Sequence, residues 1–291
     1  MILITGAGGK TGQAVIRALA GRGESVRALV RHEGQVQTVW TAGAVEMCQG
    51  DMTDLSVLSQ AMAGVRAVYH ICPNMHPDEL KIGEKLLAAA NQHTLSNLVY
   101  HSVLHPQTRD MPHHWQKNQV EDRLFASGIP YTILQPAAYM QNILVGWDRI
   151  IRQGVFANPY PVTTRLSLVD LHDVAEVAAH VLMEPGHLYA TYELVGTRPH
   201  TQTEIAALLS RILGRLVRAQ ETPLASWQKQ MKDSLSPYAL DTLLNMFRYY
   251  SANGLVGNPT VLNMLLSRPP TSLETFIERV KSGARRLTID D

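Results

Sequence analysis

Seven consecutive residues near the start of the chain have the types and spacing of a loop that binds phosphate groups. In order they are Gly6, Ala7, Gly8, Gly9, Lys10, Thr11 and Gly12. Gly6 would allow a tight turn out of a strand, Gly9 would let the backbone approach a pyrophosphate, and Gly12 would let the next helix pack close to the sheet. The N–H groups and the positive dipole end at the start of that helix would then face the phosphates. The loop therefore predicts a site for a dinucleotide.

This interpretation has two competitors. A glycine cluster also fits an ordinary turn between a strand and a helix, and the motif on its own is weak. Its position, directly after the first predicted strand and before the first predicted helix, favours phosphate binding. The segment Gly9-Lys10-Thr11 resembles the end of a nucleotide triphosphatase P-loop, which needs a glycine five residues before Gly9. Ile4 stands at that position, so a P-loop is not expected.

The end of the second predicted strand indicates which dinucleotide would bind. An acidic side chain there suits the free 2′-hydroxyl of NAD, and a basic one suits the 2′-phosphate of NADP. Arg31 stands at this point, and the nearest acidic residue, Glu33, comes two positions later. A guanidinium can hold a phosphate bidentately, so the cofactor predicted is NADP(H), with a solvated surface arginine as the alternative. Asp51 and Met52 follow the third predicted strand, where Asp51 would either accept a hydrogen bond from adenine or cap the helix near Asp54.

Alternating strands and helices are expected to position these residues. Six short, β-branched runs are predicted strands: Ile2–Thr5, Ser25–Val30, Ala44–Cys48, Ala67–Ile71, Leu98–His101 and Tyr131–Leu134. Longer segments with apolar residues at helical spacing separate them. This alternation implies parallel crossovers, and uniformly apolar runs are typical of strands buried on both faces. The fold class predicted is α/β, a Rossmann-type doubly wound parallel sheet.

The rest of the chain has a different pattern, which predicts a smaller, mostly helical C-terminal region. Past Pro136 the sequence predicts a loop over Gly154–Pro161, a helix over Asp170–Met183 and a strand over Tyr192–Val195. From Thr201 onward the pattern is mostly helical, with breaks at Pro223, Pro237 and Pro269-Pro270. We therefore expect an NADP-binding domain over residues 1–184 and a substrate or partner region over residues 185–291, which shares the late strand with the first.

The composition argues against several classes of function. The chain of 291 residues is 45% hydrophobic and 18% charged, as expected for a protein with a well-filled core. Its net charge of +1 gives no field that would attract nucleic acid or an acidic membrane, so neither is expected as a partner. The two cysteines, Cys48 and Cys72, have neither disulfide nor metal-ligand spacing, so no metal is expected. Because no leader pattern or long apolar run is seen, a cytoplasmic location is expected.

Taken together, several segments resemble the NmrA-like family, an atypical branch of the short-chain dehydrogenase/reductases. They are Ile4 to Gly12, Val30-Arg31, Gly50-Asp51, Leu98 to Val103, Thr132 to Pro136, Tyr139 to Asn142 and Asp170 to Ala175. The resemblance implies that Cys72, Pro73 and Asn74 line the nicotinamide half of the cofactor and that Lys117 reaches the nicotinamide ribose. It also implies that the nicotinamide and the substrate cleft are flanked by Tyr139, Met140, Gln141 and Asn142.

The resemblance leaves the catalytic residues open. Typical short-chain dehydrogenases pair a tyrosine with a lysine four residues on. Here His113 stands four residues before Lys117, which argues against the usual alcohol–ketone chemistry. His113, His114 or Lys117 would then supply a proton, although a histidine near a helix start is more often a surface residue. Ser102 would hydrogen-bond a carbonyl or the backbone at a strand end, and Cys72 is expected to be a small buried residue rather than a nucleophile.

Two functions are compatible with these observations. The first is an NADPH-dependent reductase, in which the cofactor delivers hydride to a small planar acceptor such as a quinone. The second is a catalytically weak redox sensor that binds NADP(H) and reports redox state to a protein partner through the C-terminal region. We favour the reductase because the cleft is expected to be rich in Met and Tyr, whereas the missing tyrosine chemistry favours the sensor.

Overall fold

The structure, a computed structural model, describes residues 1–283, which form two compact units. The first unit combines Met1–Gln107, His113–Gln135 and Val174–Tyr192, and the second combines Thr108–Pro112, Pro136–Asp173 and the described chain from Glu193 onward. The polypeptide therefore passes from one unit to the other more than once, and neither unit is a continuous stretch of sequence.

A seven-stranded sheet forms the centre of the first unit and confirms the predicted α/β Rossmann-type architecture. Its strands are β1 (Ile2–Ile4), β2 (Val26–Val30), β3 (Glu46–Gln49), β4 (Ala67–His70), β5 (Asn97–His101), β6 (Tyr131–Pro136) and β10 (Ala190–Leu194). They lie in the order β10-β6-β5-β4-β1-β2-β3. Across the sheet, every neighbouring pair from β6 to β3 is parallel. The strand order reverses between β1 and β4, and open α/β sheets bind ligands at the carboxyl ends of such strands.

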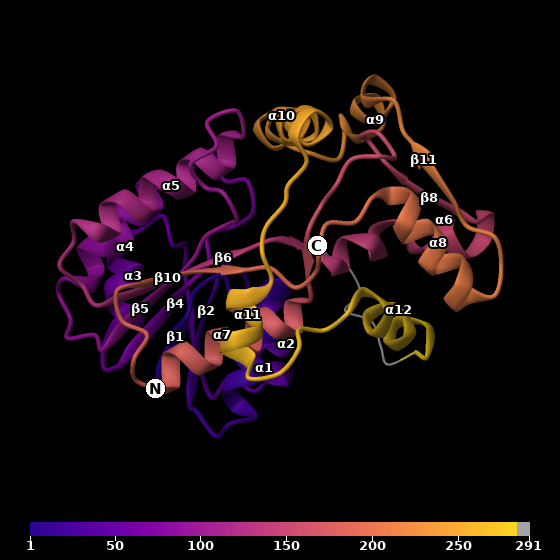
Figure 1. The fold of residues 1–291 in the computed structure, drawn as a ribbon. Coiled ribbons are helices and arrows are strands. Elements are labelled where there is room, and N and C mark those ends of the chain that lie inside the picture. Colours follow the sequence, from indigo (N-terminus) through magenta and orange to yellow (C-terminus); the bar gives the residue numbers. More distant parts are fainter. Residues whose placement is uncertain (284–291) are drawn as a thin grey trace. The chain divides into compact units, whose positions relative to one another are not determined.

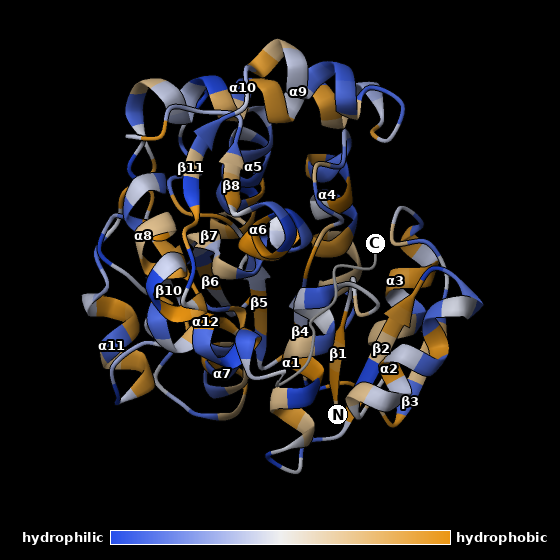
Figure 2. Cartoon of the chain, turned by 90° about the vertical axis from the view of Figure 1, so that its right-hand side faces the viewer, coloured by the Kyte–Doolittle hydropathy of each residue, from blue (hydrophilic) through white to orange (hydrophobic). Residues whose placement is uncertain are grey.

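Apolar side chains explain why these strands are central. Every residue of β1, β4 and β5 is buried, as the uniformly apolar runs predicted. Figure 2 shows β1 in the colour of hydrophobic residues. Each of the six strands predicted in the first half of the chain overlaps an observed strand, and the strand predicted late in the chain overlaps β10.

Helices cover both faces of this sheet: α1 (Lys10–Ala20), α2 (Val36–Ala42), α3 (Leu55–Met62), α4 (Glu79–Ala90), α5 (Pro112–Phe125) and α7 (Leu171–Met183). In Figure 1, α1, α2 and α7 lie on one face, and α3, α4 and α5 lie on the other. Helices α4 and α5 approach closely, because a Cβ on Gly83 would lie 2.8 Å from the methyl carbons of Val120. The core on this side includes Leu58, Met62 and Tyr100. The packing fixes α5 and α4 beside the carboxyl ends of β4 and β5.

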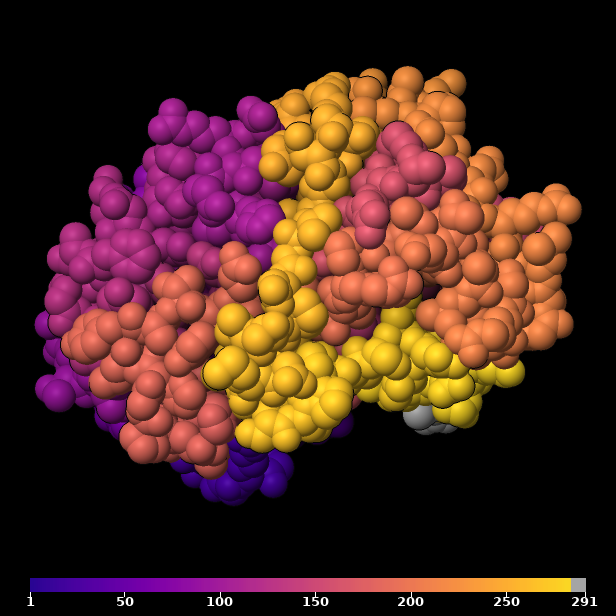
Figure 3. Space-filling model, viewed as in Figure 1, coloured from indigo at the N-terminus to yellow at the C-terminus, as the bar shows by residue number. Residues whose placement is uncertain are grey.

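The second unit is mostly helical towards its C-terminal end, as predicted. Its helices are α6 (Trp147–Gln153), α8 (Gln202–Leu213), α9 (Leu224–Met231), α10 (Pro237–Asn253), α11 (Thr260–Leu266) and α12 (Leu273–Lys281). The three predicted proline breaks are confirmed, since Pro223 precedes α9, Pro237 begins α10 and Pro269-Pro270 separates α11 from α12. Helix α9 has no buried residue, and Figure 3 shows this stretch of chain, in orange, at the surface. Within residues 1–283, none of the helices is long and apolar enough to cross a membrane.

The strands of the second unit form two short parallel pairs. Strand β7 (Ala138–Tyr139) pairs with β9 (Leu168–Val169), and β8 (Val155–Asn158) pairs with β11 (Arg218–Glu221). The prediction of a loop over Gly154–Pro161 was therefore wrong. The reason is that β11 is short, polar and mostly exposed, so no local apolar alternation marks the pairing.

Candidate dinucleotide site

The glycine loop follows β1 and leads into α1, as predicted. Gly6 has a φ of +58°, and a Cβ on it would lie 2.6 Å from the carbonyl oxygen of Ile71. A Cβ on Gly12 would lie 2.5 Å from the carbonyl oxygen of Gly6. A larger residue at either position would therefore force the loop apart. By contrast, the nearest atom to a Cβ on Gly9 is 3.4 Å away, which leaves this residue open to a ligand.

The start of α1 also suits an anion. Gly9 is the N-cap of this helix, so no side chain of the cap residue occupies the first N–H groups. The first turn contains no acidic residue, Lys10 and Thr11 in that turn are partly exposed, and Ala7 is buried. Because the first turn itself contributes no carboxylate, its backbone N–H groups and positive dipole end suit the pyrophosphate of a dinucleotide.

A buried hydrogen-bond network holds the loop against the neighbouring strand β4. The Thr5 hydroxyl lies 2.8 Å from Nδ1 of His70 and accepts a hydrogen bond of 3.0 Å from the N–H of Ile71. Thr5 and His70 are buried, and burial lowers the pKa of His70 to about 3. Its imidazole is therefore neutral at pH 7. The network thus joins the carboxyl ends of β1 and β4, where the strand order reverses, without adding a charge.

The end of β2 lies against the same loop. Arg31 is exposed, and its Nε donates to Nε2 of His32 at 2.9 Å. The side-chain oxygen of Gln35, in a 3-10 turn over Glu33–Gln35, accepts from the N–H of Arg31 at 3.0 Å. The side-chain nitrogen of Gln35 lies against Gly8, because a Cβ on Gly8 would be 2.5 Å from Gln35 Nε2. Gln35, which the sequence analysis missed, therefore holds the arginine next to the glycine loop, and contact with a 2′-phosphate stays a prediction.

Asp51 and Met52 lie in the turn between β3 and α3. The Asp51 carboxylate accepts a hydrogen bond of 2.8 Å from the backbone N–H two residues on, which lowers its pKa, and the charge of Arg31 adds to this effect. Asp54 caps α3, since its carboxylate accepts the N–H two residues on at 2.8 Å. The capping alternative for Asp51 was therefore wrong. Contact of Asp51 with adenine stays a prediction, as does that of Met52, which packs against the core.

Lys117 lies on α5 beside the carboxyl end of β5. Its ammonium group bonds to Oε1 of Glu79 at 2.5 Å and donates to the carbonyl oxygen of His101 at 3.2 Å. The same Glu79 oxygen accepts a hydrogen bond of 3.1 Å from the hydroxyl of Tyr100. Glu79 and Tyr100 are both buried, and the sequence analysis pointed to neither. The structure therefore adds a buried carboxylate to the predicted nicotinamide end of the site.

Cys72, Pro73 and Asn74 come just after β4. Cys72 is buried, whereas Pro73 and Asn74 are exposed. Burial raises the pKa of the Cys72 thiol, and the charge of Glu79 raises it further while that of Lys117 lowers it. A thiol that stays protonated is a poor nucleophile, which confirms the expectation of a small buried residue. The charges of Glu79 and Lys117 both act on Cys72, and contact of Cys72, Pro73 and Asn74 with the nicotinamide half stays a prediction.

His113 and His114 are buried at the start of α5, so the expectation of surface histidines was wrong. Their rings meet edge to face, with centroids 4.4 Å apart. Burial lowers the pKa of His113 to about 2 and that of His114 to about 4, so both are neutral at pH 7. In the described part of the chain, Nδ1 of His113 has no hydrogen-bond partner. A catalytic role for His113 stays a prediction, and at neutral pH it would involve the uncharged imidazole.

Ser102 hydrogen-bonds a side chain rather than the backbone at the strand end. Its hydroxyl donates to the carboxylate of Glu121, whose two oxygens each accept from Nε2 of Gln135 at 3.0 Å. All three residues are buried, and burial raises the pKa of Glu121. The group ties α5 to the ends of β5 and β6 and so supports the helix that carries Lys117.

The last four predicted residues belong to the second unit: Tyr139, Met140, Gln141 and Asn142, the last three in the 3-10 helix η2 (Met140–Gly146). Met140 is fully buried, and Asn142 is exposed. The Gln141 side chain is buried, donates to Asp170 at 2.7 Å and accepts from the N–H of Leu171 at 3.1 Å. Contacts of these residues with the nicotinamide and the substrate stay predictions.

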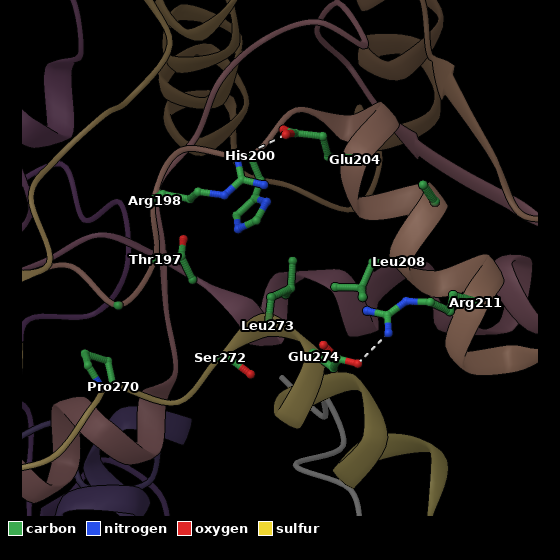
Figure 4. Close-up of a pocket in the computed structure, with 12 residues that line it drawn as sticks. Thr197, Arg198, His200, Glu204, Leu208, Arg211, Pro270, Ser272, Leu273 and Glu274 are labelled. Atoms are coloured by element: carbon green, nitrogen blue, oxygen red, sulfur yellow. Dashed lines mark hydrogen bonds and ion pairs between the residues drawn. The ribbon is translucent and has the colours of Figure 1, made fainter.

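A pocket of about 690 Å³ lies within the second unit, between α8 and the start of α12 (Figure 4). Leucines of both helices form its apolar wall. The two arginines at its rim are each neutralised, Arg198 by Glu204 at 3.0 Å and Arg211 by Glu274 at 2.8 Å. Since none of the predicted cofactor residues lines this pocket and its charges are paired, we do not assign it to the dinucleotide.

The glycine loop, the arginine beside it and the polar cluster at the ends of β4 and β5 define a dinucleotide-binding protein of the Rossmann class. The model of the NmrA-like family matches residues 1–282. The chain therefore belongs to the NmrA-like family, and the resemblance inferred from its motifs is confirmed.

Relatives of known activity match over nearly the full chain. Quinone oxidoreductase 2 of Escherichia coli (strain K12) is 29% identical over 283 residues, which is 96% of this chain and 98% of that protein. NAD(P)H azoreductase of Xenophilus azovorans is 28% identical over 290 residues, 98% of each chain. The crystal structure of the NADPH-dependent quinone oxidoreductase of Escherichia coli with bound NADPH matches with a TM-score of 0.84 at 27% identity, covering 97% of this chain and 100% of that one.

Proposed function

We propose that the protein is an NADPH-dependent reductase of a small planar acceptor such as a quinone. The observation that carries the proposal is the glycine loop with Arg31 held beside it, in a chain 27% identical to a quinone oxidoreductase solved with NADPH. A second relative is an azoreductase. Quinones and azo compounds are both flat, conjugated electron acceptors, so the two relatives support one class of substrate.

The residues of the first unit would hold the cofactor at three points. Backbone N–H groups near Gly9 would bind the pyrophosphate, Arg31 the 2′-phosphate and Lys117 the nicotinamide ribose. NADPH, when bound, supplies the hydride. Rigid attachment at both ends of the cofactor would hold its nicotinamide in one orientation toward the acceptor, which is how positioning accelerates a reaction between two bound molecules.

The reaction also needs a proton source. Reduction of a quinone to a hydroquinone takes two electrons and two protons, and hydride carries both electrons and one proton. His113 is neutral at pH 7 because burial lowers its pKa to about 2, so it is not an imidazolium acid. We therefore assign the second proton to the ammonium group of Lys117 or to water. A quinone suits this arrangement because it accepts hydride with little acid assistance.

Two measurements test the proposal. Isothermal titration with NADPH, NADP, NADH and NAD should show that NADPH binds at least about tenfold more tightly than NADH. The absorbance of NADPH should then fall when 1,4-naphthoquinone is added to catalytic amounts of protein. Tight NADPH binding without oxidation across quinones and azo compounds would contradict the reductase and support the redox sensor, whose protein partner would bind with NADPH-dependent affinity.

Because both histidines of α5 are neutral, we expect the activity not to follow a histidine titration. The pKa of His113 is about 2 and that of His114 about 4, so each gains a proton only in acid. From about pH 6 to about pH 8, the pH profiles of kcat/KM for the wild type and for His113→Gln should therefore have the same shape. A change in kcat/KM with a midpoint near about pH 6.5, present in the wild type and lost in the variant, would contradict this expectation. Thermal melting of the variant controls for loss of fold.

A further inference from the structure

Glu79 and Lys117 form a buried ion pair that the proposed function does not by itself require. Their side chains are 2% and 13% exposed, and the Glu79 oxygen and the Lys117 nitrogen lie 2.5 Å apart. Burying two charges is costly, and such a pair often contributes little to stability compared with apolar residues of the same size. A role in fixing geometry is therefore the better explanation to test.

The hydrogen bonds of this pair use two of the three N–H donors of Lys117. An ammonium group has three N–H donors. One points to Glu79 and one to the carbonyl oxygen of His101, at 2.5 and 3.2 Å. In residues 1–283 no third acceptor lies within hydrogen-bond distance, and the Lys117 nitrogen stands 5.5 Å from the centre of the Tyr100 ring. Two fixed donors thus determine where the third one points.

The carboxylate is itself held in place. Its Oε1 accepts a hydrogen bond of 3.1 Å from the Tyr100 hydroxyl, and Glu79 is the first residue of α4. Tyr100 and His101 end β5, and Cys72 follows β4. The pair therefore lies at the carboxyl ends of β4 and β5, in the half of the sheet beyond the reversal in strand order, where a dinucleotide places its nicotinamide half.

We infer that Glu79 is a positioning residue: with the His101 carbonyl it holds the Lys117 ammonium so that its third N–H points at a hydroxyl of the nicotinamide ribose. The inference rests on the proposed function, because it requires NADPH in the first unit. Glu79 touches neither cofactor nor acceptor and acts through Lys117. Its effect should therefore be confined to the nicotinamide end of the cofactor.

The test compares two ligands in Glu79→Gln, which keeps the shape and removes the charge. NADPH carries the nicotinamide ribose, whereas adenosine 2′,5′-bisphosphate lacks it and probes only the adenosine end. Isothermal titration should show NADPH affinity reduced about tenfold and bisphosphate affinity changed less than about twofold. A merely structural role would weaken both ligands alike, and an unchanged NADPH affinity would also overturn the inference. If the wild type binds neither ligand, the proposed function fails instead.

A second variant keeps the inference testable if Glu79→Gln folds poorly. Lys117→Met and the double variant Glu79→Gln/Lys117→Met both lack the lysine, and the double variant leaves no unpaired buried charge. Because Glu79 acts through Lys117, the two proteins should bind NADPH within about twofold of each other. A further loss of about tenfold in the double variant would show that Glu79 acts independently of the lysine and would overturn the inference.

Discussion

Arg31→Asp is expected to weaken NADPH binding by about thirtyfold to a hundred-and-fiftyfold and to leave NADH binding within about twofold. Arg31 is exposed and lies next to the glycine loop, because Gln35 bonds its N–H at 3.0 Å and packs on Gly8. Losing a charge-assisted contact to the 2′-phosphate costs on the order of 2–3 kcal/mol, and the new carboxylate adds repulsion. NADH lacks this phosphate, and its free hydroxyl can donate to the aspartate. Isothermal titration measures both affinities.

The matched control is Arg22→Asp. It makes the same change of net charge at another exposed arginine, just past the end of α1 that is opposite the glycine loop. At about 0.15 M salt a charge this distant is largely screened, so NADPH affinity should change less than about twofold. An equal loss in both variants would mean a general attraction to the protein rather than a phosphate contact. An unchanged preference for NADPH in Arg31→Asp would rule out the assigned role of the arginine.

The central sheet was predictable because each of its inner strands has its own local signal. The residues of β1, β4 and β5 are buried on both sides, so each strand is an apolar run that needs no knowledge of its neighbours. Strand β8 has no such signal. Its partner β11 is polar and mostly exposed, and the pairing of Val155 with Arg218 joins distant parts of the sequence. The pairing of two short strands this far apart in the sequence therefore cannot be predicted from either segment alone.

The two ends of the candidate site differ in the same way. Gly6 and Gly12 are required by the geometry of one short loop, so the phosphate end could be predicted from spacing. Glu79 could not, since a glutamate at a helix start usually indicates only a favourable interaction with the helix dipole. Its partners, Lys117 and Tyr100, come from other elements. Gln35 had a usable signal, because an amide three residues into a helical turn commonly bonds back to the preceding backbone.

In the second unit a large loss of stability is expected for Asp173→Asn. The carboxylate is fully buried and accepts three hydrogen bonds: from Arg268 at 2.8 Å, and from the N–H and hydroxyl of Thr271 at 2.6 and 2.9 Å. Arg268 and Thr271 lie between α11 and α12, so one side chain at the start of α7 anchors this connection. An asparagine would keep the shape, remove the charge opposite Arg268 and present an NH₂ group to another donor.

The expected cost follows from burial. Removing one partner of a fully buried charge pair costs about 3–5 kcal/mol. The Arg268 side chain is 41% exposed, so its charge is already partly solvated and the cost is smaller than for a fully buried pair. We therefore expect the free energy of unfolding to fall by about 2–3 kcal/mol, measured by urea denaturation. Limited proteolysis should also release α11 and α12 earlier in the variant, because the anchor of their connection is lost.

Asp148→Asn provides the matched control, with the same chemical change at a solvated ion pair in the same unit. Asp148 is 87% exposed and lies 3.6 Å from Arg152, one turn along α6. Exposed pairs of this kind contribute little, so the free energy of unfolding should change by less than about 0.5 kcal/mol. Equal stability of the two variants would show that water replaces the lost contacts of Asp173. The anchoring of the C-terminal helices would then depend on their apolar packing, such as that of the buried Leu262 and Phe276, rather than on this carboxylate.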